Sequence, residues 1–170
     1  MKVKEIEEIS DKENLVDQIV EISQKKVMAI AEENKDSYVV GADTLVEVDE
    51  EVLGKPSSED EAREMLRKLS GKKHRVITAY TLANLENNIL KSDYSESFVY
   101  FKKLSAEEIE WYVESKEPLD KAGAYGIQGL GSVFVEKIEG DFFSIMGFPI
   151  NKFIKTLEEI GVEIKDIKKI

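Results

Sequence analysis

The sequence predicts an α/β domain in which a mixed, twisted sheet is flanked by helices. Segments 74–82 and 98–101 are rich in β-branched and aromatic residues, which favour strands. Segments at about 13–33 and 58–69 repeat apolar residues at the spacing of an amphipathic helix. Because short turns as well as helices connect the predicted strands, the pattern indicates a sheet covered by helices rather than a helical bundle or a β-sandwich.

The first predicted helix, at about 13–33, is preceded by Ser10 and Glu13 at the spacing of a capping box. After it, residues 41–56 have the pattern of a strand, an acidic turn, a second strand and a Gly-Lys-Pro exit. Residues 38–40 lead into this hairpin, and their apolar side chains predict a short buried strand.

The second helix has a start and a stop signal of its own. Ser58 and Glu61 repeat the capping-box spacing, and Gly71 follows the apolar stripe as a left-handed cap. The remaining pattern predicts strands, a turn at Asn87-Asn88, a helix that Pro118 ends, a last helix from Pro149 to Gly161, and a short edge strand. The predicted strands are 74–82, a segment that runs up to 101, 132–138 and the edge strand 162–167. The helix before Pro118 is predicted at 105–113.

Length and composition limit the class of protein and the kind of metal site. The 170 residues fit one domain over 1–170, with no cysteine for disulfides or thiolate ligands. His74 is the single histidine, which excludes a histidine-cluster zinc site. Any metal must therefore be held by carboxylate and ligand oxygens, which suit magnesium or manganese.

The charge of the chain argues against binding to nucleic acid or to an anionic membrane. The net charge is −11, and the isoelectric point is near 4.8. The longest apolar runs fall well short of the roughly 20 residues of a membrane span, and residues 1–8 are too charged for a signal peptide. We therefore expect a cytoplasmic protein.

Asp43 is the first candidate for chemistry. It follows a buried strand, and Gly41 and Ala42 remove side-chain bulk immediately before it. A carboxylate at the end of a strand, with Thr44 beside it, suits a functional site better than a core. The sequence alone does not say what stands opposite it.

Other polar residues have an ordinary structural interpretation beside the functional one. Lys55 leaves a stiff turn before Pro56, as a phosphate contact would, but an exposed loop lysine is the simpler interpretation. Lys25 and Lys26 fit a solvated helix face. His74 is more readily a structural histidine than a base, and we expect the aromatic pair at 111–112 to be core.

The segment 117–131 is rich in glycine and in polar side chains. Glycines let backbone amides approach a ligand, while Asp120 and Lys121 carry charge and Gln128 carries an amide able to read a base edge. The order of the glycines matches neither a P-loop nor a dinucleotide fingerprint. From residue types alone, a plain turn region is the more common interpretation.

Taken together, these motifs resemble the Maf family of nucleoside triphosphate pyrophosphatases, which is related to the inosine triphosphate pyrophosphatases. The resemblance runs from about residue 5 to about 160, and the motif at 117–129 is long and specific. The segments that carry it are 41–44, 54–56, 69–71 with His74, 117–129, and 139–141 with 147–149.

The resemblance implies two lobes around a nucleotide cleft, and an enzyme that cleaves between the α and β phosphates. The products would be a nucleoside monophosphate and pyrophosphate, with a divalent metal as cofactor and a nucleoside triphosphate as substrate. A homodimer is plausible for such a protein. The residues at positions 44 and 128 look like the branch acting on dTTP and UTP, or on modified pyrimidine nucleotides.

The resemblance also assigns roles to individual residues. Asp43 matches the catalytic proton acceptor, and Thr44 and Gln128 match positions of base selection. Lys26 and Lys55 match lysines that contact the phosphates.

For the metal, the resemblance indicates Glu8 and Asp43 as ligands. It leaves open which of the two carboxylates binds metal and which acts as the base.

The match departs from the family pattern at the N-terminus. The family has a buried strand and a Ser/Pro/Arg loop ahead of Glu8, whereas Met1 stands seven residues before Glu8 in this sequence. We therefore expect a domain truncated at its N-terminus. The alternative is a non-catalytic nucleotide-binding or regulatory protein that has lost its phosphate loop.

Overall fold

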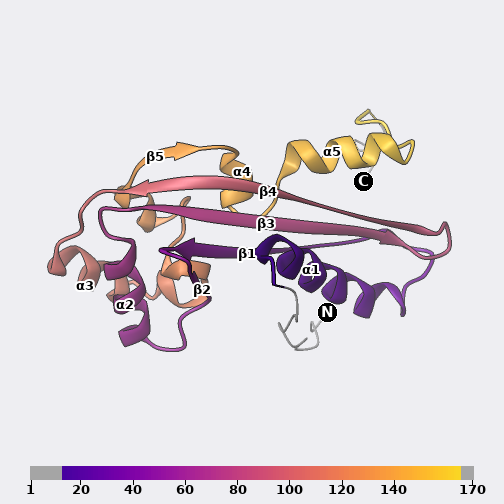
Figure 1. The fold of residues 1–170 in the computed structure, drawn as a ribbon. Helices are drawn as coiled ribbons and strands as arrows, with labels where there is room; N and C mark the ends of the chain where they lie inside the picture. Colours follow the sequence, from indigo (N-terminus) through magenta and orange to yellow (C-terminus); the bar gives the residue numbers. More distant parts are fainter. Residues whose placement is uncertain (1–12, 166–170) are drawn as a thin grey trace. The chain divides into compact units, whose positions relative to one another are not determined.

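Five strands form one sheet in the order β2-β1-β3-β4-β5 (Figure 1). The pairs β1–β2 and β4–β5 are antiparallel. The computed structural model describes residues 13–165, and this sheet with its helices confirms the predicted α/β class. The strand bounds are β1 (Val39–Val48), β2 (Glu51–Leu53), β3 (Lys73–Asn84), β4 (Ile89–Phe101) and β5 (Val135–Glu139).

Contacts divide the chain into two compact units. The first comprises residues up to 43, residues 78–95 and residues from 148 onward, and the second comprises 44–77 and 96–147. Each of the strands β1, β3 and β4 therefore contributes one part of its length to each unit. Among residues 13–165, no helix is long and apolar enough to cross a membrane.

In the first unit, α1 (Leu15–Ala31) and α5 (Ile150–Glu159) cover opposite faces of the sheet (Figure 1). Successive side chains of a strand point to opposite faces. The hydroxyl of Thr81 in β3 therefore meets Ser23 of α1, with the two oxygens 2.7 Å apart. The neighbouring Tyr80 hydroxyl lies 2.6 Å from that of Thr156 in α5.

Helix α1 confirms the helix predicted at about 13–33, but its start was assigned to the wrong residues. The cap is Asn14, whose side-chain oxygen accepts a hydrogen bond from the Val16 amide at 2.8 Å. Glu13 precedes the helix, and Ser10 lies outside the described residues. Asn14 satisfies a free amide of the first turn directly, so the capping-box pattern is not needed there.

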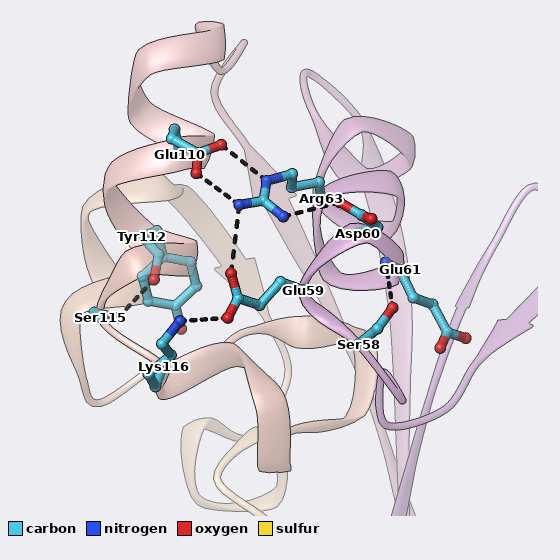
Figure 2. A network of polar contacts seen from close by, with 9 residues as sticks. All are labelled: Ser58, Glu59, Asp60, Glu61, Arg63, Glu110, Tyr112, Ser115 and Lys116. Atoms are coloured by element: carbon cyan, nitrogen blue, oxygen red, sulfur yellow. Dashed lines mark hydrogen bonds and ion pairs between the residues drawn. The ribbon is translucent and has the colours of Figure 1, made fainter.

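In the second unit, α2 (Glu59–Leu69) and α3 (Ala106–Glu114) pack side by side. Arg63 joins them, because its guanidinium donates to both carboxylate oxygens of Glu110 (Figure 2). The predicted Ser58 cap of α2 is confirmed, since its hydroxyl accepts from the Glu61 amide. The Glu61 carboxylate instead binds Ser57, so only half of that capping box forms.

Two strand predictions for the second half of the chain, at 132–138 and 162–167, need correction, and one short helix was missed. Residues 130–134 form a short 3-10 helix, η3 (Leu130–Phe134), and β5 begins only at Val135. Residues 162–165 are not a strand, and the rest of the predicted edge strand lies outside the described residues. A four-residue helix, α4 (Phe142–Ile145), was not predicted, because it is too short to show a period.

The aromatic pair of α3 was predicted to be core, and half of that prediction is wrong. Tyr112 is fully buried, but Trp111 is 47% exposed. The buried face of α3 includes Tyr112 and Val113, and one further step of about 100° places Trp111 at the edge of that face.

His74 lies in the core of the second unit, as the structural interpretation expects. Its Nε2 is 2.8 Å from the Tyr125 hydroxyl, and the Phe101 ring packs edge-on against it at 4.9 Å between centroids. Burial lowers the pKa of His74 to about 4. The imidazole is therefore neutral in the folded protein at any pH where the chain is expected to work.

We predict that His74 makes the protein sensitive to mild acid. Between about pH 6.5 and pH 4 the unfolded chain binds a proton on His74 and the folded chain does not, so stability falls as the pH falls through this window, by about 3 kcal/mol in all. His74→Phe should remove this component. Chemical denaturation of both proteins at pH 7 and pH 4.5 measures it, and equal losses in the two proteins would contradict it.

Candidate functional site

An ion pair in the first unit joins two of the predicted site residues. Lys26 Nζ lies 3.0 Å from Asp43 Oδ2, and the two side chains are 23% and 20% exposed. Lys26 comes from α1 and Asp43 from β1. A half-buried charge pair that stays open to solvent can exchange partners with an anionic ligand, which a fully buried pair cannot do without a larger rearrangement.

Gly41 allows α1 to lie close to β1 at this point. A Cβ atom at position 41 would stand 2.8 Å from Cγ2 of Val27, closer than real Cβ contacts allow. Val27 is buried and directly follows Lys26. The missing side chain therefore sets the helix-to-strand distance that lets Lys26 reach Asp43.

The adjacent lysine has a different environment. Lys25 Nζ lies 2.7 Å from Glu21 one turn back in α1, on an exposed part of the helix. The interpretation as a solvated face therefore holds for Lys25. For Lys26 it is wrong, because one step of about 100° around the helix turns its side chain toward β1.

A chain of hydroxyl groups fixes α1 to the sheet beside this pair. Ser23 is within 2.7 Å of Thr81, and Thr81 is within 2.8 Å of Ser92 in β4. Gln24 Nε2 donates to the same Ser92 oxygen at 3.1 Å. These residues were not predicted from the sequence, although a serine at a core position of an apolar helix face is a signal for a buried hydrogen bond.

Lys55 lies in the second unit, where its turn meets the glycine-rich loop. The Gly123 amide donates to the Gly54 carbonyl at 3.0 Å. The pKa of Asp120 lies below its ordinary value, mainly through a hydrogen bond from Lys121 and in smaller part through the charge of Lys55. The structure therefore brings Lys55 to the charged start of this loop.

Thr44 and Gln128 also belong to the second unit. Thr44 follows Asp43 in β1, so its side chain points to the other face of the strand. It lies beside Gly147, where a Cβ would come within 3.7 Å of the Thr44 hydroxyl. Gln128 is exposed, and it follows the buried Ile127 in a turn closed by a Gly129 amide to Gly126 carbonyl bond of 3.3 Å.

Comparison with known proteins agrees with the family resemblance of these motifs. The family model of Maf-like proteins matches residues 1–160. This chain belongs to the Maf family. A dTTP/UTP pyrophosphatase of Fusobacterium nucleatum is 52% identical over 165 residues, which cover 97% of this chain and 86% of the relative. A dTTP/UTP pyrophosphatase of Bacillus cereus strain G9842 is 46% identical over 148 residues, which cover 87% of this chain and 76% of the relative.

One predicted residue of this Maf-family chain lies outside the described residues, namely Glu8. Within residues 13–165, no three histidine or acidic side chains gather as a metal cage would require. Asp43 supplies a single carboxylate, which is a binding mode that magnesium accepts when substrate phosphates complete its shell.

We predict that Gly41→Ala destabilises the protein by about 1–3 kcal/mol, because the new methyl group overlaps Val27. The cost should be smaller in a Val27→Ala background, where the overlap is relieved. Urea denaturation of the wild type, the two single variants and the double variant measures the cost of Gly41→Ala in both backgrounds.

Gly54→Ala is the matched control for this prediction. A Cβ atom there meets nothing within 4 Å, so its stability should stay close to that of the wild type. If Gly41→Ala is as well tolerated as Gly54→Ala, the close approach of α1 and β1 does not depend on Gly41.

Proposed function

We propose that this chain is a nucleoside triphosphate pyrophosphatase acting on dTTP and UTP or on modified pyrimidine triphosphates. The products are the nucleoside monophosphate and pyrophosphate. The observation that carries the proposal is the Lys26–Asp43 pair, which combines a carboxylate base with an ammonium group at a solvent-accessible position. The two relatives are named as dTTP/UTP pyrophosphatases, which supports the same substrates.

In this proposal Asp43 is the proton acceptor. A water molecule attacks the α phosphorus, and its proton passes to the Asp43 carboxylate. The bridging P–O bond breaks, and the electron pair leaves with pyrophosphate. A positioned carboxylate base of this kind accelerates a reaction by about 10²–10⁴-fold.

Lys26 and Lys55 counter the charge of the triphosphate. Lys26 holds the Asp43 carboxylate at 3.0 Å, which orients it, and its ammonium can also face a phosphate oxygen. Lys55 leaves its turn in a direction limited by Pro56. Fixed positive charges stabilise the negative charge that grows on the leaving group.

A divalent cation fits the oxygen donors of this site. Asp43 would hold magnesium or manganese together with substrate phosphate oxygens, and we propose Glu8 as the second carboxylate. When bound, the cation would supply further neutralisation of the leaving pyrophosphate.

We propose that Gln128 and Thr44 select the base. A glutamine amide offers one acceptor and a donor group, which match the N3–H and O4 of thymine or uracil. Gln128 is exposed at its turn and free of steric cover, as a base contact must be. A cytoplasmic enzyme, with a possible homodimer, fits this role.

The proposal predicts magnesium- or manganese-dependent release of pyrophosphate from dTTP and UTP. Asp43→Asn should lower kcat by about 10²–10⁴-fold, because the amide cannot accept the proton. A coupled pyrophosphate assay on a panel of triphosphates measures it, with Asp36→Asn as a control at an exposed site. Nucleotide binding without turnover by the wild type would favour a non-catalytic protein instead.

The two adjacent lysines of α1 give a second, sharper prediction. Lys26→Ala should lower kcat/KM for dTTP by about 10–100-fold through loss of a preorganised charge. Lys25→Ala removes the surface ion pair with Glu21 and should change kcat/KM by less than about threefold. Equal effects in the two variants would show that the Lys26–Asp43 contact has no catalytic role.

A further inference from the structure

The carboxylate of Glu117 closes the glycine-rich loop upon itself. Its Oε2 accepts a hydrogen bond from the Leu130 amide at 2.9 Å, and its Oε1 accepts one from the Gly131 amide at 3.2 Å. The hydroxyl of Tyr112 donates to the same Oε1 at 2.9 Å. A residue at the start of the loop thus holds backbone that follows 13 and 14 residues later.

Tyr112 fixes this arrangement to the core of the second unit. Its ring is fully buried in α3, and its hydroxyl oxygen accepts from the Gly126 amide at 2.9 Å. Burial raises the pKa of Tyr112, so the hydroxyl keeps the proton that it donates to Glu117. The loop is therefore held at residue 126 by the tyrosine and at residues 130–131 by the glutamate.

The glycines of the loop make room for these two side chains. A Cβ atom at Gly129 would overlap the Glu117 carboxylate. One at Gly131 would lie 2.7 Å from the Tyr112 hydroxyl oxygen. These glycines therefore allow the backbone to close tightly around Glu117, which is a different use from the ligand cradle considered from the sequence.

Gln128 lies in the short span between the two holding points. The turn from Gly126 to Gly129 buries Ile127 and leaves Gln128 exposed. A glycine-rich segment would otherwise lose much conformational entropy when it orders around a ligand. Because residues 126 and 130–131 are already held in the free protein, part of this entropy loss no longer opposes binding.

The Glu117 carboxylate carries its charge at neutral pH. Burial opposes ionisation, but the backbone bonds from Leu130 and Gly131 and the Tyr112 hydroxyl outweigh it, so the pKa of Glu117 lies below its ordinary value. Bonds to an ionised acceptor are about twice as strong as neutral ones.

We propose that Glu117, backed by Tyr112, is a positioning residue that holds Gln128 in place for selection of the pyrimidine base. Glu117 does not touch the substrate and acts only through the loop. The expected effects on KM and base preference rest on the proposed function, whereas the closure of the loop by Glu117 does not.

The test is the isosteric variant Glu117→Gln. Its amide group turns one acceptor into a donor, which then faces a backbone N–H. We expect a rise of about tenfold in KM for dTTP, with kcat nearly unchanged, as the loss of one charge-assisted bond implies. The preference for dTTP over dATP should fall by a similar factor.

Glu110→Gln is the matched control. Glu110 is also a glutamate of the second unit, but it binds Arg63 between α2 and α3 and has no bond to the loop (Figure 2). It should leave both KM and base preference unchanged. Tyr112→Phe removes one of the three donors to Glu117 and the acceptor of the Gly126 amide, and it serves as a second variant should Glu117→Gln fail to fold.

A double-variant cycle separates positioning from general stability. In a Gln128→Ala background, Glu117→Gln should have no further effect on base preference, because the group that it positions is gone. Independent effects of the two changes, or an unchanged preference in Glu117→Gln, would overturn the proposal.

Amide hydrogen exchange, measured by NMR, tests the closure of the loop without requiring enzymatic turnover. The Leu130 and Gly131 amides should exchange at least about tenfold faster in Glu117→Gln, because the substitution either removes the acceptor of each hydrogen bond or distorts the bond. If the wild type hydrolyses no triphosphate, the proposed activity fails, and the preference for dTMP over dAMP in binding then tests the positioning role. Unchanged exchange at both amides would overturn the inference in either case.

Discussion

The ion pair between Lys26 and Asp43 is the contact on which the proposed chemistry depends. Removing two charges from water is costly, and the cost is recovered only where the partners approach closely. Here the approach is set by apolar packing, since Gly41 leaves space for Val27 and brings α1 against β1. A buried hydroxyl chain through Ser23 and Thr81 fixes the same helix. The position of one ammonium group thus follows from the packing around it.

In the second unit, the carboxylate of Glu117 fixes the position of a chain segment. This loop contains many glycines, which favour disorder, whereas the proposed selection of the base needs Gln128 in a defined direction. Glu117 and Tyr112 order it with hydrogen bonds to backbone amides, and the glycines supply the space for those bonds. The same residues that make the loop flexible in an unfolded chain allow it to close tightly in the folded one.

Local signals predicted the fold well where they were long or specific. The period of α1, the Ser58 cap, and the strands β3 and β4 were all recognised from the sequence. The errors fall on short elements, on the start of α1 and on side-chain burial. Tyr38 and Val40 of the lead-in predicted to be buried are 52% and 42% exposed. The predicted strand at 132–138 begins too early, because residues 130–134 form a 3-10 helix whose Leu130 amide donates to Glu117. Asn14 caps α1 because it stands directly before the first turn, where a single acceptor is enough.

The sequence by itself determined the class of fold, the membership of the Maf family and the candidate residues Asp43, Lys55 and Gln128, because strand and helix periods and contiguous motifs are properties of neighbouring residues. The family resemblance singled out Lys26, but only the tertiary structure showed that Lys26 meets Asp43 and that Glu117 holds the loop around Gln128. Both contacts join residues 13 or more positions apart in the chain, and their distances depend on how closely separate segments pack. No local pattern encodes that spacing.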